Sequence, residues 1–249
     1  MSFNPFSLEG KTILVTGASS GIGQAAAIAA SRLGATIILT GRNKEQLAAT
    51  CALLANSGHR QFAADLLKAD ARDALVDFCP ELDGVVMSAG AAAMRPMRMA
   101  DADHLRAMLA VNYEAQVLLT QRLLARRKLK TGASLVYVTA TAAHLSPLAT
   151  GAYAGAKAAL VSTVRTIASE HAKKGLRANC VAPGYVDTPM YAALDGVTSF
   201  AGNHELFPLG ISAPEDIAHG IAYLLADASR WVTRSTLNID GGHSLHLRQ

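Results

Sequence analysis

The fold is decided near the N-terminus by the stretch Thr16-Gly17-Ala18-Ser19-Ser20-Gly21-Ile22-Gly23. A short apolar run, Thr12 to Val15, precedes it, and an alanine-rich segment, Gln24 to Leu33, follows. This order predicts a strand, a glycine-rich turn and a helix. Backbone N–H groups and the positive end of the helix dipole attract an anion at such a turn, and glycines let a pyrophosphate approach the backbone. Although the spacing is Gly-x-x-x-Gly-x-Gly rather than Gly-x-Gly-x-x-Gly, its setting predicts dinucleotide binding.

Apolar strand-like runs alternate with helix-like segments along the whole chain. The expected strands are Ile13–Thr16, Thr36–Thr40, Gln61–Ala64, Gly84–Ser88, Leu135–Thr139, Arg177–Ala182 and Thr236–Ile239. The expected helices are Gln24–Leu33, Lys44–Asn56, Ala69–Phe78, Asp101–Arg127, Ala152–Lys173 and Pro214–Ala226. Continuous apolar strands separated by helices indicate a parallel sheet covered on both faces. We therefore expect an α/β fold, a single doubly wound Rossmann domain over residues 1–249 with a seven-stranded parallel sheet, binding its ligand beyond the carboxyl ends of the strands.

Composition narrows the class of protein further. The 249 residues are 51% hydrophobic and 17% charged, with a net charge of +4. No apolar run is long enough to span a membrane, and Met1–Pro5 lacks a basic region followed by an apolar one. The three cysteines (Cys51, Cys79 and Cys180) have no paired spacing, which favours reduced thiols and a cytoplasmic location.

Neither nucleic acid nor a metal is an expected ligand. The basic cluster Arg126–Lys130 carries no interleaved aromatic residues, so we expect it to compensate a helix dipole rather than to bind nucleic acid. The eight histidines are scattered. The closest pair, His243 and His246, has only Asp240 as an acidic neighbour and no cysteine nearby, so we expect a solvated tail and no metal site.

The second and third expected strands end on residues suited to an adenosine moiety. Gly41 occupies the position where an acidic residue would bind the ribose hydroxyls of NAD, and Arg42 follows it. An arginine there can pair with the 2′-phosphate of NADP, or it can simply face solvent at the start of a helix. Asp65 closes the third strand, where it could accept a hydrogen bond from adenine or cap the next helix.

Two further signals lie later in the chain. Asn112 stands among apolar residues of a long helix, where a buried amide needs hydrogen-bond partners; it either ties two strands together or holds a water chain. Tyr153 and Lys157 are four residues apart, which places a phenol and an ammonium on one helix face. Such a pair is commonly a surface pair. At the active-site end of a sheet, however, the positive charge would lower the phenol pKa toward the working range of an acid–base catalyst.

The motifs that carry a resemblance to a known family are Thr16–Gly23, Ser88-Ala89-Gly90, Asn112, Tyr153 with Lys157, and Pro183-Gly184. On these motifs the chain resembles the short-chain dehydrogenase/reductase family, particularly its 3-oxoacyl-carrier-protein-reductase-like and its polyol or sugar dehydrogenase-like members. The likeness covers nearly the full length. It implies that Tyr153 is the acid–base residue, that Lys157 binds the nicotinamide ribose and lowers the tyrosine pKa, and that Asn112 anchors a proton relay. It also implies cofactor contacts from Gly17, Ser19, Ile22, Gly23, Arg42, Asp65, Leu66, Ala89, Gly90, Tyr153, Lys157, Pro183, Gly184, Val186 and Thr188.

Two departures from that family pattern matter. Ser88 stands where the family usually has asparagine, and Ala140 stands where it has its catalytic serine. Thr139 or Thr141 could replace the missing hydroxyl, although strand alternation points both away from the direction of Ala140 unless the loop bends. The leading hypothesis is an NADP-dependent oxidoreductase acting on a carbonyl or alcohol. The alternative, favoured by Ala140, is a catalytically weak cofactor-binding regulator or assembly subunit.

The resemblance also implies a substrate lid near residues 190–209 and a homotetramer. The tetramer would form through Asp101–Arg127, Ala152–Lys173 and the last strand. Apolar residues in the lid and in the neighbouring loops give a preference for an apolar or amphipathic small-molecule substrate, although any one of them could instead be an oligomer contact or core. These residues are Met190, Tyr191, Leu194, Phe200, Phe207, Met94, Met97 and Leu145.

Overall fold

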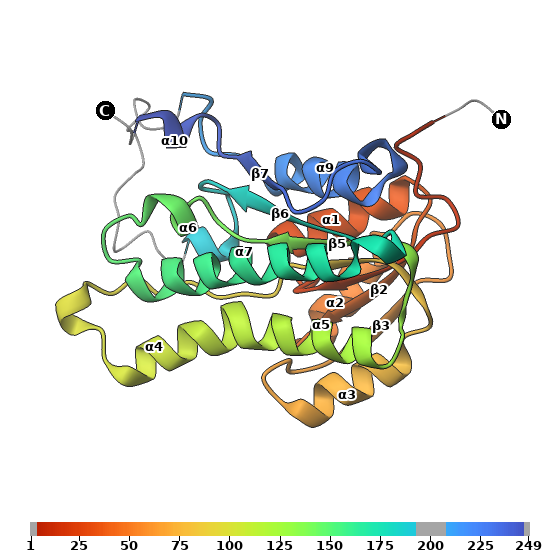
Figure 1. The fold of residues 1–249 in the computed structure, drawn as a ribbon, viewed down its shortest axis with the longest axis horizontal. Helices are drawn as coiled ribbons and strands as arrows, with labels where there is room; N and C mark the ends of the chain where they lie inside the picture. The colour runs from red at the N-terminus through yellow and green to blue at the C-terminus, as the bar shows by residue number, and fades with distance from the viewer. Residues whose placement is uncertain (1–3, 193–207, 247–249) are drawn as a thin grey trace.

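A computed structural model describes residues 4–192 and 208–246. Its strands form one seven-stranded sheet in the order β3-β2-β1-β4-β5-β6-β7, and every pairing is parallel (Figure 1). The strands are β1 (Thr12–Thr16), β2 (Thr36–Gly41), β3 (Arg60–Ala63), β4 (Leu82–Met87), β5 (Leu129–Val138), β6 (Arg177–Pro183) and β7 (Thr236–Ile239). The α/β doubly wound fold and its seven-stranded parallel sheet are confirmed. Because the strand order reverses between β1 and β4, the ligand crevice is expected beyond their carboxyl ends.

Helices cover both faces of this sheet (Figure 1). One face carries α1 (Gly21–Arg32), α2 (Lys44–Ala52) and α9 (Pro214–Leu225), and the other carries α3 (Ala69–Phe78), α5 (Ala115–Ala125) and α7 (Gly151–His171). Each face has its own hydrophobic cluster. Within β1, Ile13 and Val15 belong to one cluster and Leu14 to the other, as the alternation of side chains along a strand requires.

Shorter elements complete the described chain. They are η1 (Met97–Met99), α4 (Ala102–Leu109), η2 (Ala110–Glu114), α6 (Ala142–Leu145), η3 (Ala172–Lys174), α8 (Pro189–Ala192), η4 (Asp227–Ser229) and α10 (His243–His246). The single helix expected over Asp101–Arg127 is therefore divided: α4 and α5 are joined by η2, a π-helical turn. Such a turn inserts extra backbone into a helix and often marks a functional position.

The basic cluster Arg126–Lys130 makes specific contacts that the sequence did not predict. Arg126 follows the end of α5 as expected, but its guanidinium pairs with Asp77 on α3. Lys128 lies directly before β5 and Lys130 within it, and Lys130 pairs with Asp83 on β4 at 2.8 Å. The cluster thus links α3, β4 and β5, and dipole compensation accounts for only part of it.

Two findings bear on the class of protein. Within residues 4–192 and 208–246, no helix combines the length and apolarity needed to cross a membrane. Cys51, Cys79 and Cys180 are free thiols; Cys79 and Cys180 are buried and Cys51 is half-buried.

Candidate active site

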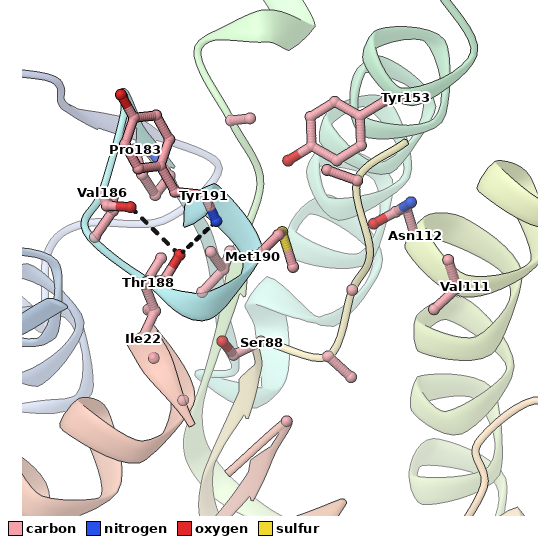
Figure 2. A pocket seen from close by; sticks show the side chains of 18 of the residues that line it. Ile22, Ser88, Val111, Asn112, Tyr153, Pro183, Val186, Thr188, Met190 and Tyr191 are labelled. Atoms are coloured by element: carbon pink, nitrogen blue, oxygen red, sulfur yellow. Dashed lines mark hydrogen bonds between the residues drawn. The ribbon is translucent and has the colours of Figure 1, made fainter. Parts of the chain in front are cut away.

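A cavity of about 400 Å³ opens beyond the carboxyl ends of the strands. It is lined by every residue that the sequence placed in the site: Gly17, Ser19, Ile22, Gly23, Arg42, Asp65, Leu66, Ala89, Gly90, Asn112, Tyr153, Lys157, Pro183, Gly184, Val186 and Thr188. Figure 2 shows Tyr153 pointing into this space from α7, Asn112 on the facing helix, and Ile22 and Ser88 farther from the tyrosine. A volume of this size suits a bound organic molecule.

The glycine-rich turn forms one end of the cavity. Gly17 has φ +65°, and a Cβ there would lie 2.9 Å from the Cα of Ala89, so only glycine fits. A Cβ on Gly23 would collide with the Gly17 carbonyl. The helix that follows, α1, has no side-chain cap from Ser20 and no acidic residue in its first turn. Its N–H groups are therefore open to an anion, as pyrophosphate binding requires.

The segment after β4 is held in place by side chains rather than by the sheet. The hydroxyl of Thr16 accepts hydrogen bonds from the N–H groups of Ser88 (3.0 Å) and Ala89 (3.1 Å). Two residues further on, Ala91 is bound by Asn112 through both its N–H and its carbonyl. We call Ser88–Ala91 the β4 strap; it packs against the glycine turn at Ala89, and its residues Ser88, Ala89 and Gly90 line the cavity.

Asn112 lies on the π-turn η2 and is fully buried. Its Nδ2 donates to the carbonyls of Ala91 (2.8 Å) and Met108 (3.1 Å), and its Oδ1 accepts from the Ala91 N–H (3.2 Å). The amide thus joins a helix to the β4 strap, and not two strands. A Cβ on Gly90 would lie 2.9 Å from Asn112 Oδ1 and 3.6 Å from Lys157 Nζ, which brings the strap against both polar residues.

Tyr153 and Lys157 share one face of α7, as their spacing predicts. The Lys157 Nζ lies 5.8 Å from the centre of the Tyr153 ring and donates to the Val138 carbonyl at 2.8 Å. Burial lowers the pKa of Lys157 to about 8 and raises the pKa of Tyr153 to about 12. In this structure the expected lowering of the tyrosine pKa is thus not realised, because loss of water contact disfavours the phenolate and the ammonium is directed at a carbonyl.

The hydroxyls of Thr139 and Thr141, on either side of Ala140, differ in whether another residue of the protein already binds them. Thr139 donates its hydroxyl to the Val181 carbonyl at 2.9 Å, so it is committed to strand β6. The chain bends after β5 ends at Val138, and Thr141 both precedes α6 and lines the cavity. Its side chain does not cap α6 and has no hydrogen-bond partner among the described residues. Both threonines line the cavity, and Thr141 is the one whose hydroxyl is not bonded to another described residue.

The adenosine-side predictions have mixed outcomes. Arg42 is exposed at the rim of the cavity, and Asn43, not Arg42, caps α2 by accepting from the Gln46 N–H at 2.8 Å. Asp65 does not cap α3, whose N-cap is Lys68. Instead its Oδ1 accepts from the Leu67 N–H at 3.1 Å and stabilises the loop that lines the cavity.

Tyr191 was expected in the site from the sequence, but its two aromatic neighbours there, Tyr185 and His243, were not. The rings of Tyr185 and Tyr191 lie 5.7 Å apart, and Tyr185 meets His243 edge-on at 5.5 Å. His243 is buried and lines the cavity, so the expectation of a solvated tail is wrong for this residue. Its position just after β7 could have indicated this, because the carboxyl ends of the strands border the site. Thr188 fixes the intervening turn by accepting from the Tyr191 N–H at 3.3 Å (Figure 2).

Part of the expected lid can be located. Met190 and Tyr191 line the cavity together with Met94, whereas Leu194, Phe200 and Phe207 lie outside the described residues. Met97 is exposed and does not line the cavity. Within the described part of the chain, no group of three or more His, Cys, Asp or Glu residues is arranged to hold a metal ion.

A glycine turn at an uncapped helix, with Tyr153 and Lys157 facing it across one cavity, defines a dinucleotide-binding α/β protein of the dehydrogenase type. A family model described as enoyl-(acyl carrier protein) reductase matches residues 17–244. The chain belongs to the short-chain dehydrogenase/reductase family and is similar to its 3-oxoacyl-carrier-protein reductases.

Particular relatives are similar along almost their whole length. The D-threitol dehydrogenase of Mycolicibacterium smegmatis is 33% identical, covering 96% of this chain and 95% of that protein. A 3-oxoacyl-[acyl-carrier-protein] reductase of Rickettsia felis is 28% identical, covering 94% and 97%. Among solved structures, a putative NAD(P)-dependent gluconate 5-dehydrogenase from Beutenbergia cavernae with bound NADP at low occupancy has a TM-score of 0.86 at 30% identity, covering 97% and 100%.

Proposed function

We propose that the protein is an NADP-dependent oxidoreductase that interconverts a small-molecule carbonyl and its alcohol. The observation that carries this proposal is the convergence of Tyr153, Lys157 and Asn112 on one cavity with the glycine turn at its other end. The solved structure of the gluconate 5-dehydrogenase relative, which contains NADP, also supports a nicotinamide cofactor. The three unpaired thiols support a reducing, cytoplasmic location.

The preference for NADP rests on the space at the end of β2. A Cβ on Gly41 would collide with the Ser19 hydroxyl, so an acidic side chain that would bind NAD ribose hydroxyls would require Ser19 to rotate away. Arg42 and Gln46 line the same corner, and α2 begins beside it with its N–H groups. A guanidinium, a hydroxyl and a helix N-terminus together suit the 2′-phosphate of NADP.

The chemistry follows from the three polar residues. When bound, a reduced nicotinamide supplies a hydride. Burial keeps the Tyr153 phenol protonated at neutral pH, so its proton is ready for the carbonyl oxygen as negative charge develops there. Lys157 places a positive charge near the phenol and would donate to the ribose hydroxyls of the cofactor, and Asn112 fixes the π-turn from which a proton relay would run. Thr141 supplies the hydroxyl that Ala140 lacks.

The substrate end favours an apolar or amphipathic carbonyl compound. Met94, Met190 and Tyr191 line it, and Pro147 lies at its edge. We propose that residues 190–209 act as a lid over this end in a single oxidoreductase domain spanning the chain.

Cofactor titration of the wild-type protein and of Arg42→Asp tests the proposal. NADPH should bind more tightly than NADH, and Arg42→Asp should weaken NADPH by about 1.5–3 kcal/mol, the scale of a hydrogen bond to a charged group. NADH binding should change little in the variant. Tighter binding of NADH by the wild type would overturn the cofactor assignment. NADPH binding without oxidation across a broad carbonyl panel would favour the alternative, a regulator whose activity was lost with the serine at position 140.

A further inference from the structure

Gln116 is a buried polar residue that the chemistry above does not use. It is fully buried near the start of α5, one helical turn after Asn112, and it does not line the cavity. Its Nε2 donates to two main-chain carbonyls, that of Ala89 at 2.8 Å and that of Asn112 at 3.3 Å. One amide group therefore joins the β4 strap to the π-turn.

The orientation of this amide is set by its neighbours. With two carbonyl oxygens on one side, only the NH₂ end of the side chain can face them, since the reverse orientation would place oxygen against oxygen. The other end, Oε1, is buried without a hydrogen-bond partner among the described residues. A buried acceptor left unpaired costs stability, and an apolar side chain of the same length would avoid that cost. Core packing alone does not explain glutamine at this position.

The contacts of the strap show what Gln116 adds. Thr16 fixes the N–H groups of Ser88 and Ala89, and Asn112 fixes both backbone groups of Ala91. The Ala89 carbonyl lies between these two anchors, and Gln116 is its partner. Without Gln116, the peptide that joins Ala89 to Gly90 would be free to rotate against the cavity. Ala89 and Gly90 line that cavity on the side where the proposed cofactor ribose lies.

From this geometry we infer that Gln116 is a positioning residue for the cofactor: it fixes the Ala89 carbonyl and the π-turn of Asn112 as one rigid unit. The inference rests on the proposed cofactor but not on any particular substrate. Because Gln116 touches no part of the cavity, it acts on cofactor affinity only through the strap.

The test compares Gln116→Met with Thr120→Val. Methionine matches the length of glutamine without its donors. Thr120 lies one turn further along, is equally buried, and bonds the Gln116 carbonyl and the Tyr137 hydroxyl, neither of which belongs to the strap. Gln116→Met leaves the Ala89 carbonyl without its partner, and Thr120→Val leaves the Tyr137 hydroxyl without one, so both variants should lower the melting temperature. Only Gln116→Met should raise the Kd for NADPH, by about tenfold, which is the usual scale of one lost hydrogen bond. Cofactor fluorescence gives Kd without a substrate.

The outcomes separate clearly. A Kd for Gln116→Met within twofold of wild type overturns the inference, and so does an equal rise in Thr120→Val, since that would reflect general loosening of the core. If Gln116→Met does not fold, Gln116→Asn replaces it; its amide is one methylene short of the Ala89 carbonyl and must give the same rise. Failure of the wild type to bind either NADPH or NADH would instead count against the proposed function.

Discussion

At the scale of single residues, Lys157 is a buried charge that lowers the stability of the folded protein while serving the proposed reaction. Its ammonium is buried, and burial lowers its pKa from 10.5 to about 8. Below pH 8 the lysine is protonated in both the folded and the unfolded chain, so the folded state bears the full cost of burying a cation. Between pH 8 and 10.5 the unfolded chain binds more protons, and the free energy of unfolding therefore rises with pH through this window.

Lys157→Met should consequently stabilise the protein at neutral pH. The relieved cost is on the order of 3 kcal/mol from the shift in pKa, offset by about 1 kcal/mol for the unpaired Val138 carbonyl. Urea unfolding at about pH 7 and about pH 9.5 measures both the sign and the pH dependence. The advantage of the variant should shrink at the higher pH. A variant that is less stable than wild type at neutral pH would contradict the assignment of a buried charge.

At the scale of elements, the junction between β5 and α6 decides how the missing serine is replaced. Thr139 is bonded to β6, whereas Thr141 lines the cavity with a hydroxyl that has no partner among the described residues. Thr141→Val should therefore lower turnover by about 10²-fold, the scale of one preorganised donor to a developing oxyanion. Ala140→Ser should give little gain. Turnover assayed on one substrate tests both variants, and a large gain from Ala140→Ser without loss from Thr141→Val would show that nothing replaces the serine.

Local sequence patterns predicted the strands and the glycine turn. They did not predict features that depend on contacts between residues far apart in the chain. Continuous apolar runs located all seven strands, and the glycine turn located the cavity, because both signals are local. The π-turn in the long helix was not predicted. The residue that indicates it is Asn112, a buried amide with a hydrogen-bond partner on the β4 strap, which is distant in the sequence. The burial of His243 was missed for the same reason, since it depends on a contact with Tyr185.

At the scale of the whole molecule, we propose that four copies associate. Helices α4, α5 and α7 form one outer layer of the chain (Figure 1), and the exposed Leu105 and Leu118 lie on that layer. Pairing of these helices and of the β7 edges between copies would give the expected homotetramer. Multi-angle light scattering at micromolar concentration should report four times the mass of 26.0 kDa. A monomer under those conditions would refute the assembly.

The central claim, that Tyr153 transfers the proton in an NADP-dependent reaction, is tested most directly by Tyr153→Phe assayed in parallel for binding and for turnover. Only the phenol oxygen is lost, and the ring packing on α7 is retained. The account predicts an NADPH Kd within about twofold of wild type and turnover reduced by at least about 10²-fold, the lower end of general acid catalysis. Retention of most of the activity on a true substrate would contradict the mechanism.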